Sequence, residues 1–289
     1  MKLLVIGGTR FFGKRFVSDC IQKKYEVTLL TRGQTQDPFE NKVRRLKADR
    51  TKKDQFNEAV KGLNFDVVLD QTCMTASDAQ IAIEALKGNI KHFVMTSTLS
   101  VYPQKANLKE TDVDTINYIP QPAANPGEEY SQGKQAAEQQ YLVQKHFSVG
   151  IARIPMILGP DDYTKRLFKH VDYIKNTKEL YFPNLEAKFS YLFSQDAANA
   201  LMWLCENQKS GVYNFSSPDQ WTLKQLVETI EIVTGKNLIL AREATDQNYS
   251  PFGISEDYYM DVSKAESEGF KVPLLKEWMP ELIQHLADQ

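Results

Sequence analysis

Two residues of this chain have the types and the spacing needed to move a proton. Tyr130 and Lys134 are four positions apart, in the run Tyr-Ser-Gln-Gly-Lys. On a helix, residues i and i+4 lie on one face, so the two side chains would be neighbours. A lysine ammonium beside a phenol stabilises the phenolate, which lets the tyrosine serve as a general acid or base. Taken alone, an exposed helix with a surface tyrosine and lysine is the more common explanation.

A cluster of hydroxyl-bearing residues precedes this pair in the chain. The apolar run that starts at His92 ends in Thr96-Ser97-Thr98, and Ser100 follows two positions later. Ligands of open α/β sheets bind at the carboxyl ends of the strands. A hydroxyl at that edge can hold the oxygen whose proton Tyr130 moves, although turn formation is the commoner use of such residues.

A glycine-rich turn lies at the start of the chain. The apolar run Leu3–Ile6 leads into Gly7 and Gly8, and apolar residues at helical spacing follow Gly13. Strand, glycine turn and helix form the first unit of a dinucleotide-binding fold, where the pyrophosphate rests on N–H groups of the helix N-terminus. Because Arg10 replaces the usual middle glycine, the turn alone favours a nucleotide only modestly over a plain strand-to-helix corner.

The rest of the chain alternates between strand and helix patterns. Apolar runs predict strands at 26–31, 43–47, 66–70, 92–96 and 149–154, with helices at about 51–60, 79–86 and 128–146. We expect Thr51 to cap the first of these helices, and a polar helix to run from Gly159 to Lys175.

This order predicts an α/β fold, a doubly wound Rossmann-type parallel sheet with a smaller C-terminal α/β substrate lobe. The expected dinucleotide-binding domain comprises residues 1–155 with 186–218. The expected small lobe comprises residues 156–185 with 219–289.

Composition narrows the class of protein. The chain has 289 residues and a net charge of −2, which argues against a dedicated nucleic-acid or membrane-surface binder. Its three cysteines stand far apart, without a C-x-x-C pair, so we expect a reducing compartment and neither zinc nor disulfides. With no apolar run of membrane-spanning length and Met1 leading directly into a strand, the expected location is the cytoplasm.

In combination these pieces resemble the extended short-chain dehydrogenases/reductases of the NAD-dependent epimerase/dehydratase family, over nearly the whole chain. Further matching runs are 66–70, 97–102, 153–160, 195–197 and 211–214. The run Gly7-Gly8-Thr9-Arg10-Phe11-Phe12-Gly13, with Arg32-Gly33 after the second strand, is similar to a narrower branch. That branch mixes uncharacterised bacterial epimerase- or reductase-like proteins with chloroplast stem-loop RNA-binding proteins.

The resemblance implies roles for individual residues. Tyr130 would be the acid/base, Lys134 would hold the nicotinamide ribose, and Thr98 would orient the substrate oxygen, with Ser97 and Ser100 as alternatives. The implied cofactor-binding residues are Gly7, Gly8, Thr9, Arg10, Phe11, Phe12, Gly13, Arg32, Asp49 (facing the adenine), Arg50, Gln71, Ser97, Tyr130 and Lys134. The implied substrate residues are Ser100, Arg153 (either structural or beside the substrate), Asp162 and Arg166.

The end of the second strand bears on the choice of nucleotide. NAD enzymes of this fold place an acid there to bind the ribose 2′-hydroxyl, whereas this chain has Thr31-Arg32. A guanidinium can pair with a 2′-phosphate. We therefore favour NADP, with NAD still possible and with Arg32 as a solvated turn residue as the alternative.

Departures from the family pattern narrow the reaction. Leu99-Ser100 stand where sugar-nucleotide dehydratases carry Asp-Glu, and Pro155-Met156 stand where many nucleotide-sugar enzymes carry Asn. We therefore expect an NAD(P)-dependent oxidoreductase or epimerase that acts on a hydroxyl or ketone of a small molecule or sugar derivative.

The alternative is a non-catalytic or moonlighting NAD(P)-binding protein that binds RNA or senses redox state. RNA is disfavoured because the main basic stretch is typical of a solvated edge: Lys42, Arg44, Arg45, Lys47, Arg50, Lys52 and Lys53. The resemblance also implies a homodimer paired through helices 76–87 and 128–146.

Overall fold

The computed structural model describes residues 1–289 and divides the chain into two compact units. Unit 1 consists of Met1–Val101, Glu110–Ile154 and Ser194–Phe215. Unit 2 consists of Tyr102–Lys109, Pro155–Phe193 and Ser216–Gln289. The two units are described separately below.

Unit 1 is built on a seven-stranded sheet in which all the paired strands are parallel. Its order is β3-β2-β1-β4-β5-β6-β11, which reverses direction between β1 and β4. The strands are β1 (Lys2–Ile6), β2 (Glu26–Thr31), β3 (Arg44–Lys47), β4 (Phe65–Asp70), β5 (Ile90–Thr98), β6 (Ser148–Ile154) and β11 (Gly211–Asn214). The central strands read as continuous apolar runs because both faces of a parallel sheet are covered. This is the Rossmann-type α/β fold that the sequence predicts.

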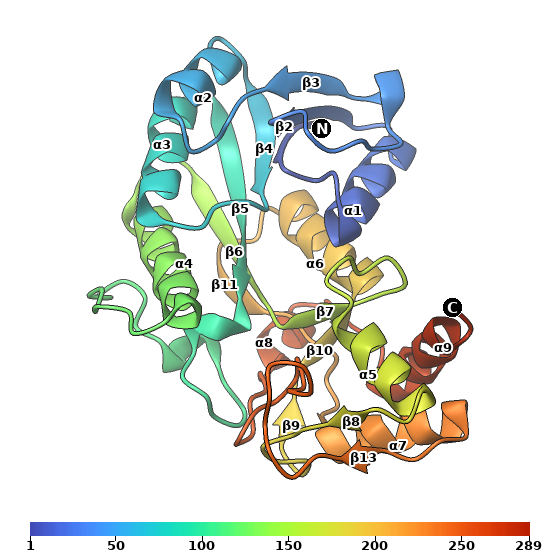
Figure 1. The fold of residues 1–289 in the computed structure, drawn as a ribbon. Coiled ribbons are helices and arrows are strands. Elements are labelled where there is room, and N and C mark those ends of the chain that lie inside the picture. Colours follow the sequence, from blue (N-terminus) through green and yellow to red (C-terminus); the bar gives the residue numbers. More distant parts are fainter. The chain divides into compact units, whose positions relative to one another are not determined.

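Helices cover the two faces of this sheet (Figure 1). Helices α1 (Phe11–Gln22) and α6 (Ser194–Glu206) pack together on one face. Helices α2 (Lys53–Val60), α3 (Ala76–Leu86) and α4 (Pro126–Val143) cover the other, with short 3₁₀ turns at Glu40–Lys42, Leu99–Val101 and Glu110–Asp112. The strand order reverses between β1 and β4. In open α/β sheets ligands bind outside the carboxyl ends of the strands at such a reversal, so this edge is where a ligand is expected.

Unit 2 consists of helices with short strand pairs. Strand β10 (Tyr191–Phe193) pairs with β7 (Met156–Leu158), β12 (Trp221–Thr222) with β9 (Lys188–Phe189), and β13 (Ile239–Leu240) with β8 (Glu179–Leu180). Helices α5 (Arg166–Lys175), α7 (Leu223–Thr234) and α9 (Leu275–Ala287) pack on one another, and α8 (Ser263–Ser267) is a single short helix.

Several boundaries differ from those expected from the sequence. Thr51 does not cap α2, because the helix begins one residue later with Lys52 at its N-cap, and the Thr51 hydroxyl donates to the Asp49 carboxylate. Helix α5 begins at Arg166 rather than near Gly159. Residues 102–109, 155, 186–193 and 216–218, assigned from the sequence to the nucleotide-binding domain, lie in unit 2. Residues 186–193 belong there because β9 and β10 pair with strands of that unit.

No helix of this chain is both long and apolar enough to cross a bilayer.

Candidate active site

The glycine turn between β1 and α1 leaves no room for side chains. Gly7 and Gly8 have φ values of +95° and +83°, a region that favours glycine. A Cβ on Gly7 would lie 2.8 Å from Thr72 Cγ2, and one on Gly8 would lie 2.8 Å from Val5 Cγ1. The turn therefore brings bare backbone to the start of α1, where Arg10 is the N-cap and its side chain makes no capping hydrogen bond. The first N–H groups of α1 can accordingly serve an anion.

Gln71, the first residue after β4, packs closely against this turn. A Cβ on Gly13 would collide with Gln71 Oε1, and would lie 3.0 Å from Gly8 Cα. The other end of the same amide, Gln71 Nε2, is buried and has no hydrogen-bond partner. A glycine cradle beside an unpartnered buried donor fits the phosphates and ribose of a dinucleotide.

The carboxyl ends of β2 and β3 carry Arg32 and Asp49. Arg32 follows Thr31, the last residue of β2, and is exposed. The pKa of Asp49 lies below its usual range, mainly because the Thr51 hydroxyl and backbone N–H donate to its carboxylate, with a smaller contribution from the Arg32 cation. The Arg32 guanidinium is thus close enough to help lower the pKa of Asp49. Both residues lie at the edge of the sheet where a dinucleotide carries its adenosine ribose.

Arg50 differs from its neighbours because its side chain is buried. The guanidinium donates through Nη2 to Asp70 Oδ2, and Nη1 lies 3.1 Å from Asp78 Oδ1. Asp70 is the last residue of β4, and Asp78 belongs to the capping box of α3. Arg50 therefore joins β4 to α3 beneath the loop that carries Gln71, which favours an indirect role for its side chain in nucleotide binding.

Tyr130 and Lys134 lie on α4, as their spacing predicts. Asn125 caps this helix by accepting from the N–H of Glu128. Lys134 is only 3% exposed, and its Nζ donates to the carbonyl oxygens of Cys73 (2.7 Å) and Thr96 (3.0 Å). The same ammonium lies 5.9 Å from the centre of the Tyr130 ring, while Tyr130 itself is 41% exposed. An ammonium has three donors, so one remains for a ligand beside an accessible phenol.

The hydroxyls of Ser97 and Thr98, the last two residues of β5, have different environments. The Ser97 hydroxyl is buried and donates to Glu138 Oε1 of α4. Thr98 is partly exposed, and its Oγ1 accepts from the N–H of Ser100 at 3.2 Å. Because successive side chains of a strand point to opposite faces, Ser97 faces α4 and Thr98 does not. This arrangement favours Thr98 over Ser97 as the residue that meets a substrate.

Glu138 is a member of the cluster that we did not anticipate from the sequence. Glu138 and Arg153 are both completely buried, and their charged groups are 2.6 Å apart. The guanidinium also donates to Thr115 Oγ1 and to the carbonyl of Glu110. Of the two roles left open for Arg153, this burial favours the structural one. The one sequence signal for the pair is an arginine in the apolar strand 149–154, since a buried charge requires a partner.

The substrate residues expected in the small lobe lie in unit 2. Asp162 accepts from the N–H and the hydroxyl of Thr164 (2.9 and 2.6 Å), which shapes the turn before α5. Arg166 is the first residue of α5, and its Nη1 lies 2.5 Å from Met156 Sδ. Their contact with a substrate stays a prediction.

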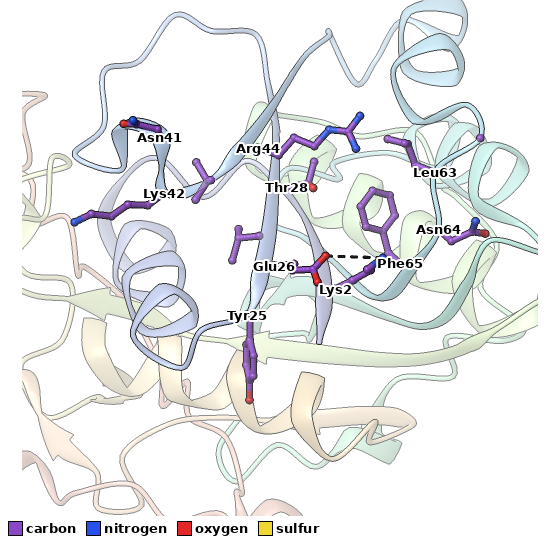
Figure 2. A pocket seen from close by; sticks show the side chains of 13 residues that line it. Lys2, Tyr25, Glu26, Thr28, Asn41, Lys42, Arg44, Leu63, Asn64 and Phe65 are labelled. Carbon is purple, nitrogen blue, oxygen red and sulfur yellow. Dashed lines mark ion pairs between the residues drawn. The ribbon is translucent and has the colours of Figure 1, made fainter.

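A hollow in unit 1 lies away from these residues. A concavity of about 760 Å³ opens at the amino edge of the sheet, where β1, β2, β3 and β4 begin (Figure 2). Lys2 and Glu26, two of its lining residues, face each other across 3.8 Å and are both well exposed. None of the residues of the glycine turn, α4 or the end of β5 lines it.

Comparison with known proteins identifies the family. The family model described as "NAD dependent epimerase/dehydratase family" matches residues 3–216. The chain belongs to this family. It is similar to the chloroplast stem-loop binding protein of 41 kDa b of Arabidopsis thaliana, with 27% identity over 246 residues. That match covers 78% of this chain and 61% of the relative. It is also similar to a 2'-dehydrokanamycin reductase of Streptomyces kanamyceticus, with 27% identity over 48% of this chain and 37% of the relative.

Solved structures share the fold across the whole chain. The NAD complex of UDP-glucose 4-epimerase from Thermus thermophilus superposes with a TM-score of 0.75 and 18% identity, covering 100% of this chain and 98% of that one. The NAD complex of dTDP-glucose 4,6-dehydratase from Bacillus anthracis gives 0.77 and 19%, covering 100% and 97%. The chain spans less than two thirds of the curated relatives above but nearly the whole of these two structures.

Proposed function

We propose that this chain is an NADP-dependent oxidoreductase or epimerase that acts on a hydroxyl or ketone group of a small molecule or sugar derivative. The observation that carries the proposal is the environment of two side chains of α4. Its Lys134 is buried and held by two backbone carbonyls, and its Tyr130 is accessible beside that ammonium. A surface lysine would not be held in this way, so the alternative of an ordinary exposed helix loses its support.

The side chains divide the work of the reaction. The bound nicotinamide supplies the site that gives or takes a hydride. Tyr130 gives or takes the proton at its phenol oxygen, and the Lys134 ammonium stabilises the phenolate and donates its remaining N–H to a ribose hydroxyl. Thr98 Oγ1 donates to the substrate oxygen and keeps it within reach of Tyr130. The glycine turn, Gln71 and the first N–H groups of α1 hold the phosphates and the ribose.

The preference for NADP rests on the end of β2. Arg32 is exposed at the point where NAD enzymes of this fold carry an acid. A 2′-phosphate there would make a charge-assisted hydrogen bond with the guanidinium. Titration of nucleotide-free protein with NADPH and with NADH tests this preference, and equal or tighter binding of NADH would contradict it.

Replacement of the phenol tests the catalytic assignment. Because general acid–base catalysis contributes roughly 10²- to 10⁴-fold, Tyr130→Phe should lower kcat by at least about 10²-fold while leaving NADPH affinity nearly unchanged. Turnover is followed by absorbance of the reduced nicotinamide with a panel of ketones, aldehydes and sugar nucleotides. Tyr249→Phe is a matched control because Tyr249 is also 41% exposed and lies in unit 2. Full activity of Tyr130→Phe would refute the assignment.

The RNA-binding alternative has less support from the basic stretch at 42–53. Arg45 is held by two hydrogen bonds to Asp37, and Arg50 is buried against carboxylates. Lys42 and Arg44 line the amino-edge concavity, whereas Lys47 ends β3 at the opposite edge. These cations do not form a single strip along which a phosphate backbone could lie. Retention of RNA that weakens steeply with salt, in a protein without turnover, would favour the alternative.

A homodimer paired through α3 and α4 remains part of the proposal. The two helices pack on each other within one chain, and sedimentation at several protein concentrations would measure the association.

A further inference from the structure

The buried pair Glu138–Arg153 has no part in the proton and hydride steps described above. Both side chains are 0% exposed in unit 1, and the carboxylate accepts from Ser97 Oγ as well as from Arg153. Burying two charges carries a desolvation cost that their attraction often only balances, so a well-packed apolar pair is frequently as stable. A gain in the stability of unit 1 is therefore a weak explanation for the presence of this ion pair.

The contacts of the pair converge on the residues of the candidate site. Ser97 and Arg153 are direct neighbours in the parallel pairing of β5 with β6, and Ser97 immediately precedes Thr98. Glu138 is one helical turn beyond Lys134 on the buried face of α4. One carboxylate thus connects the strand that presents Thr98 to the helix that presents Tyr130 and Lys134.

The same guanidinium connects a third segment. Arg153 donates to Thr115 Oγ1 at 2.8 Å and to the carbonyl of Glu110 at 3.2 Å, and the Glu110 carboxylate accepts from the N–H of Asn214 at 2.8 Å. The planar fork of arginine fixes direction as well as distance. The segment before α4 and the end of β11 are therefore tied to the same point.

Helix α4 packs closely at Gly133 against the backbone of Met74. A Cβ on Gly133 would lie 2.6 Å from the carbonyl oxygen of Met74. Lys134 reaches the carbonyls of Cys73 and Thr96 only at this close approach. A shift of α4 along the sheet would lengthen both hydrogen bonds.

We propose that Glu138 and Arg153 are positioning residues that set α4 against the end of β5, so that Tyr130, Lys134 and Thr98 share one geometry. The proposal rests on the proposed function for its catalytic consequence. Its structural part concerns the place of Lys134 and can be tested without turnover. A misplacement of about 1 Å can cost roughly 10²-fold in rate.

The test replaces both charges with apolar side chains, Glu138→Leu with Arg153→Met, so that neither charge remains buried alone. We expect an unchanged or higher Tm, a kcat lowered by about 10²-fold, and a substrate KM within about threefold of the parent. The single variant Arg153→Lys keeps the charge but loses the planar guanidinium. Its kcat should lie between that of the parent and that of the double variant. A kcat of the double variant within threefold of the parent would overturn the proposal.

A core substitution away from α4 separates positioning from general loss of stability. Phe56→Leu in α2 changes a fully buried side chain of the same unit, and should lower Tm without lowering kcat.

A crystal structure of the double variant keeps the two proposals apart. If the parent turns over no carbonyl compound, the proposed function fails. The positioning proposal is then decided by Lys134 Nζ, whose displacement from the Cys73 and Thr96 carbonyls by about 1 Å or more would support it. An unmoved Lys134 would refute it.

Discussion

The two edges of the unit 1 sheet hold their charged side chains in opposite ways. At the carboxyl edge, Lys134 is 3% exposed and fixed by two carbonyls. At the amino edge, the side chains of Lys2 and Glu26 are 61% and 74% exposed around a concavity of about 760 Å³. A site needs polar groups that are already oriented when the ligand arrives. The comparison therefore favours the carboxyl edge, which has buried and directed donors, as the place of the proposed chemistry over the hollow at the amino edge.

The largest expected effect is a fall in the free energy of unfolding at low pH, caused by His92 near the amino edge. His92 in β5 is fully buried, with its Nδ1 2.7 Å from Ser148 Oγ at the start of β6. Burial lowers the pKa of His92 from 6.5 to about 4. The unfolded chain therefore takes up a proton at a higher pH than the folded chain does, so stability falls as the pH drops through this window. The loss should reach up to about 3 kcal/mol.

Urea unfolding at pH 7 and near pH 4.5 measures that loss. His92→Asn should unfold with a smaller difference between the two pH values, while its NADPH affinity at pH 7 stays that of the parent. An identical pH dependence in the variant would exclude His92 as the source, and a weakened nucleotide affinity would break the distinction between the edges.

The second effect concerns the glycine turn at the carboxyl edge. Gly13→Ala would force its new Cβ against the Gln71 amide and within 3.0 Å of Gly8 Cα. Such overpacking costs roughly 1–3 kcal/mol, which corresponds to about tenfold or more in NADPH affinity if the turn moves. Gly62→Ala is the control, since a Cβ there meets nothing within 4 Å, although its φ of +70° makes some loss of stability expected. Fluorescence titration measures the NADPH affinity of both variants. An unchanged affinity of Gly13→Ala would contradict the proposed role of the glycine turn in holding the cofactor.

The third effect is confined to one nucleotide. Arg32→Ser removes a hydrogen bond to a charged group, worth about 1.5 kcal/mol or more, so NADPH should bind roughly tenfold more weakly. NADH, which lacks the 2′-phosphate, should bind as before. Equal weakening of both nucleotides would assign Arg32 to the shared part of the cofactor instead.

The smallest effect is expected from the lining of the concavity. Surface substitutions away from special features usually change stability by less than about 0.5 kcal/mol. Lys42→Ser and Arg44→Ser should therefore leave Tm, NADPH affinity and kcat almost unchanged. A loss of nucleotide affinity comparable with that of Arg32→Ser would show that the amino edge takes part in binding.

The sequence predicts the sheet and the turn because local signals suffice for them. Leu3–Ile6 and Val67–Leu69 are continuous apolar runs, as buried parallel strands require, and Gly7 follows the first of them directly. The spacing of Tyr130 and Lys134 likewise needs only a helix to bring the two side chains to neighbouring positions.

Other features depend on contacts that no local pattern contains. Glu138 lies in the polar run Glu-Gln-Gln, which is typical of an exposed helix, and only the fold brings it to Ser97 and Arg153. Thr51 has a good capping side chain, but the N-cap of α2 is Lys52 and the Thr51 hydroxyl donates to Asp49. The predicted start of α5 at Gly159 is wrong because Asp162 forms a local turn with Thr164, and the helix begins only at Arg166.

The anchors of Lys134 have a consequence for how this site can change. Both acceptors are main-chain carbonyls, of Cys73 and Thr96, and every residue type supplies a main-chain carbonyl. Mutational drift at positions 73 and 96 can therefore alter side chains without removing the anchors, provided that the strands keep their path. Saturation mutagenesis should find position 134 nearly invariant, while positions 73 and 96 accept any residue that fits the core.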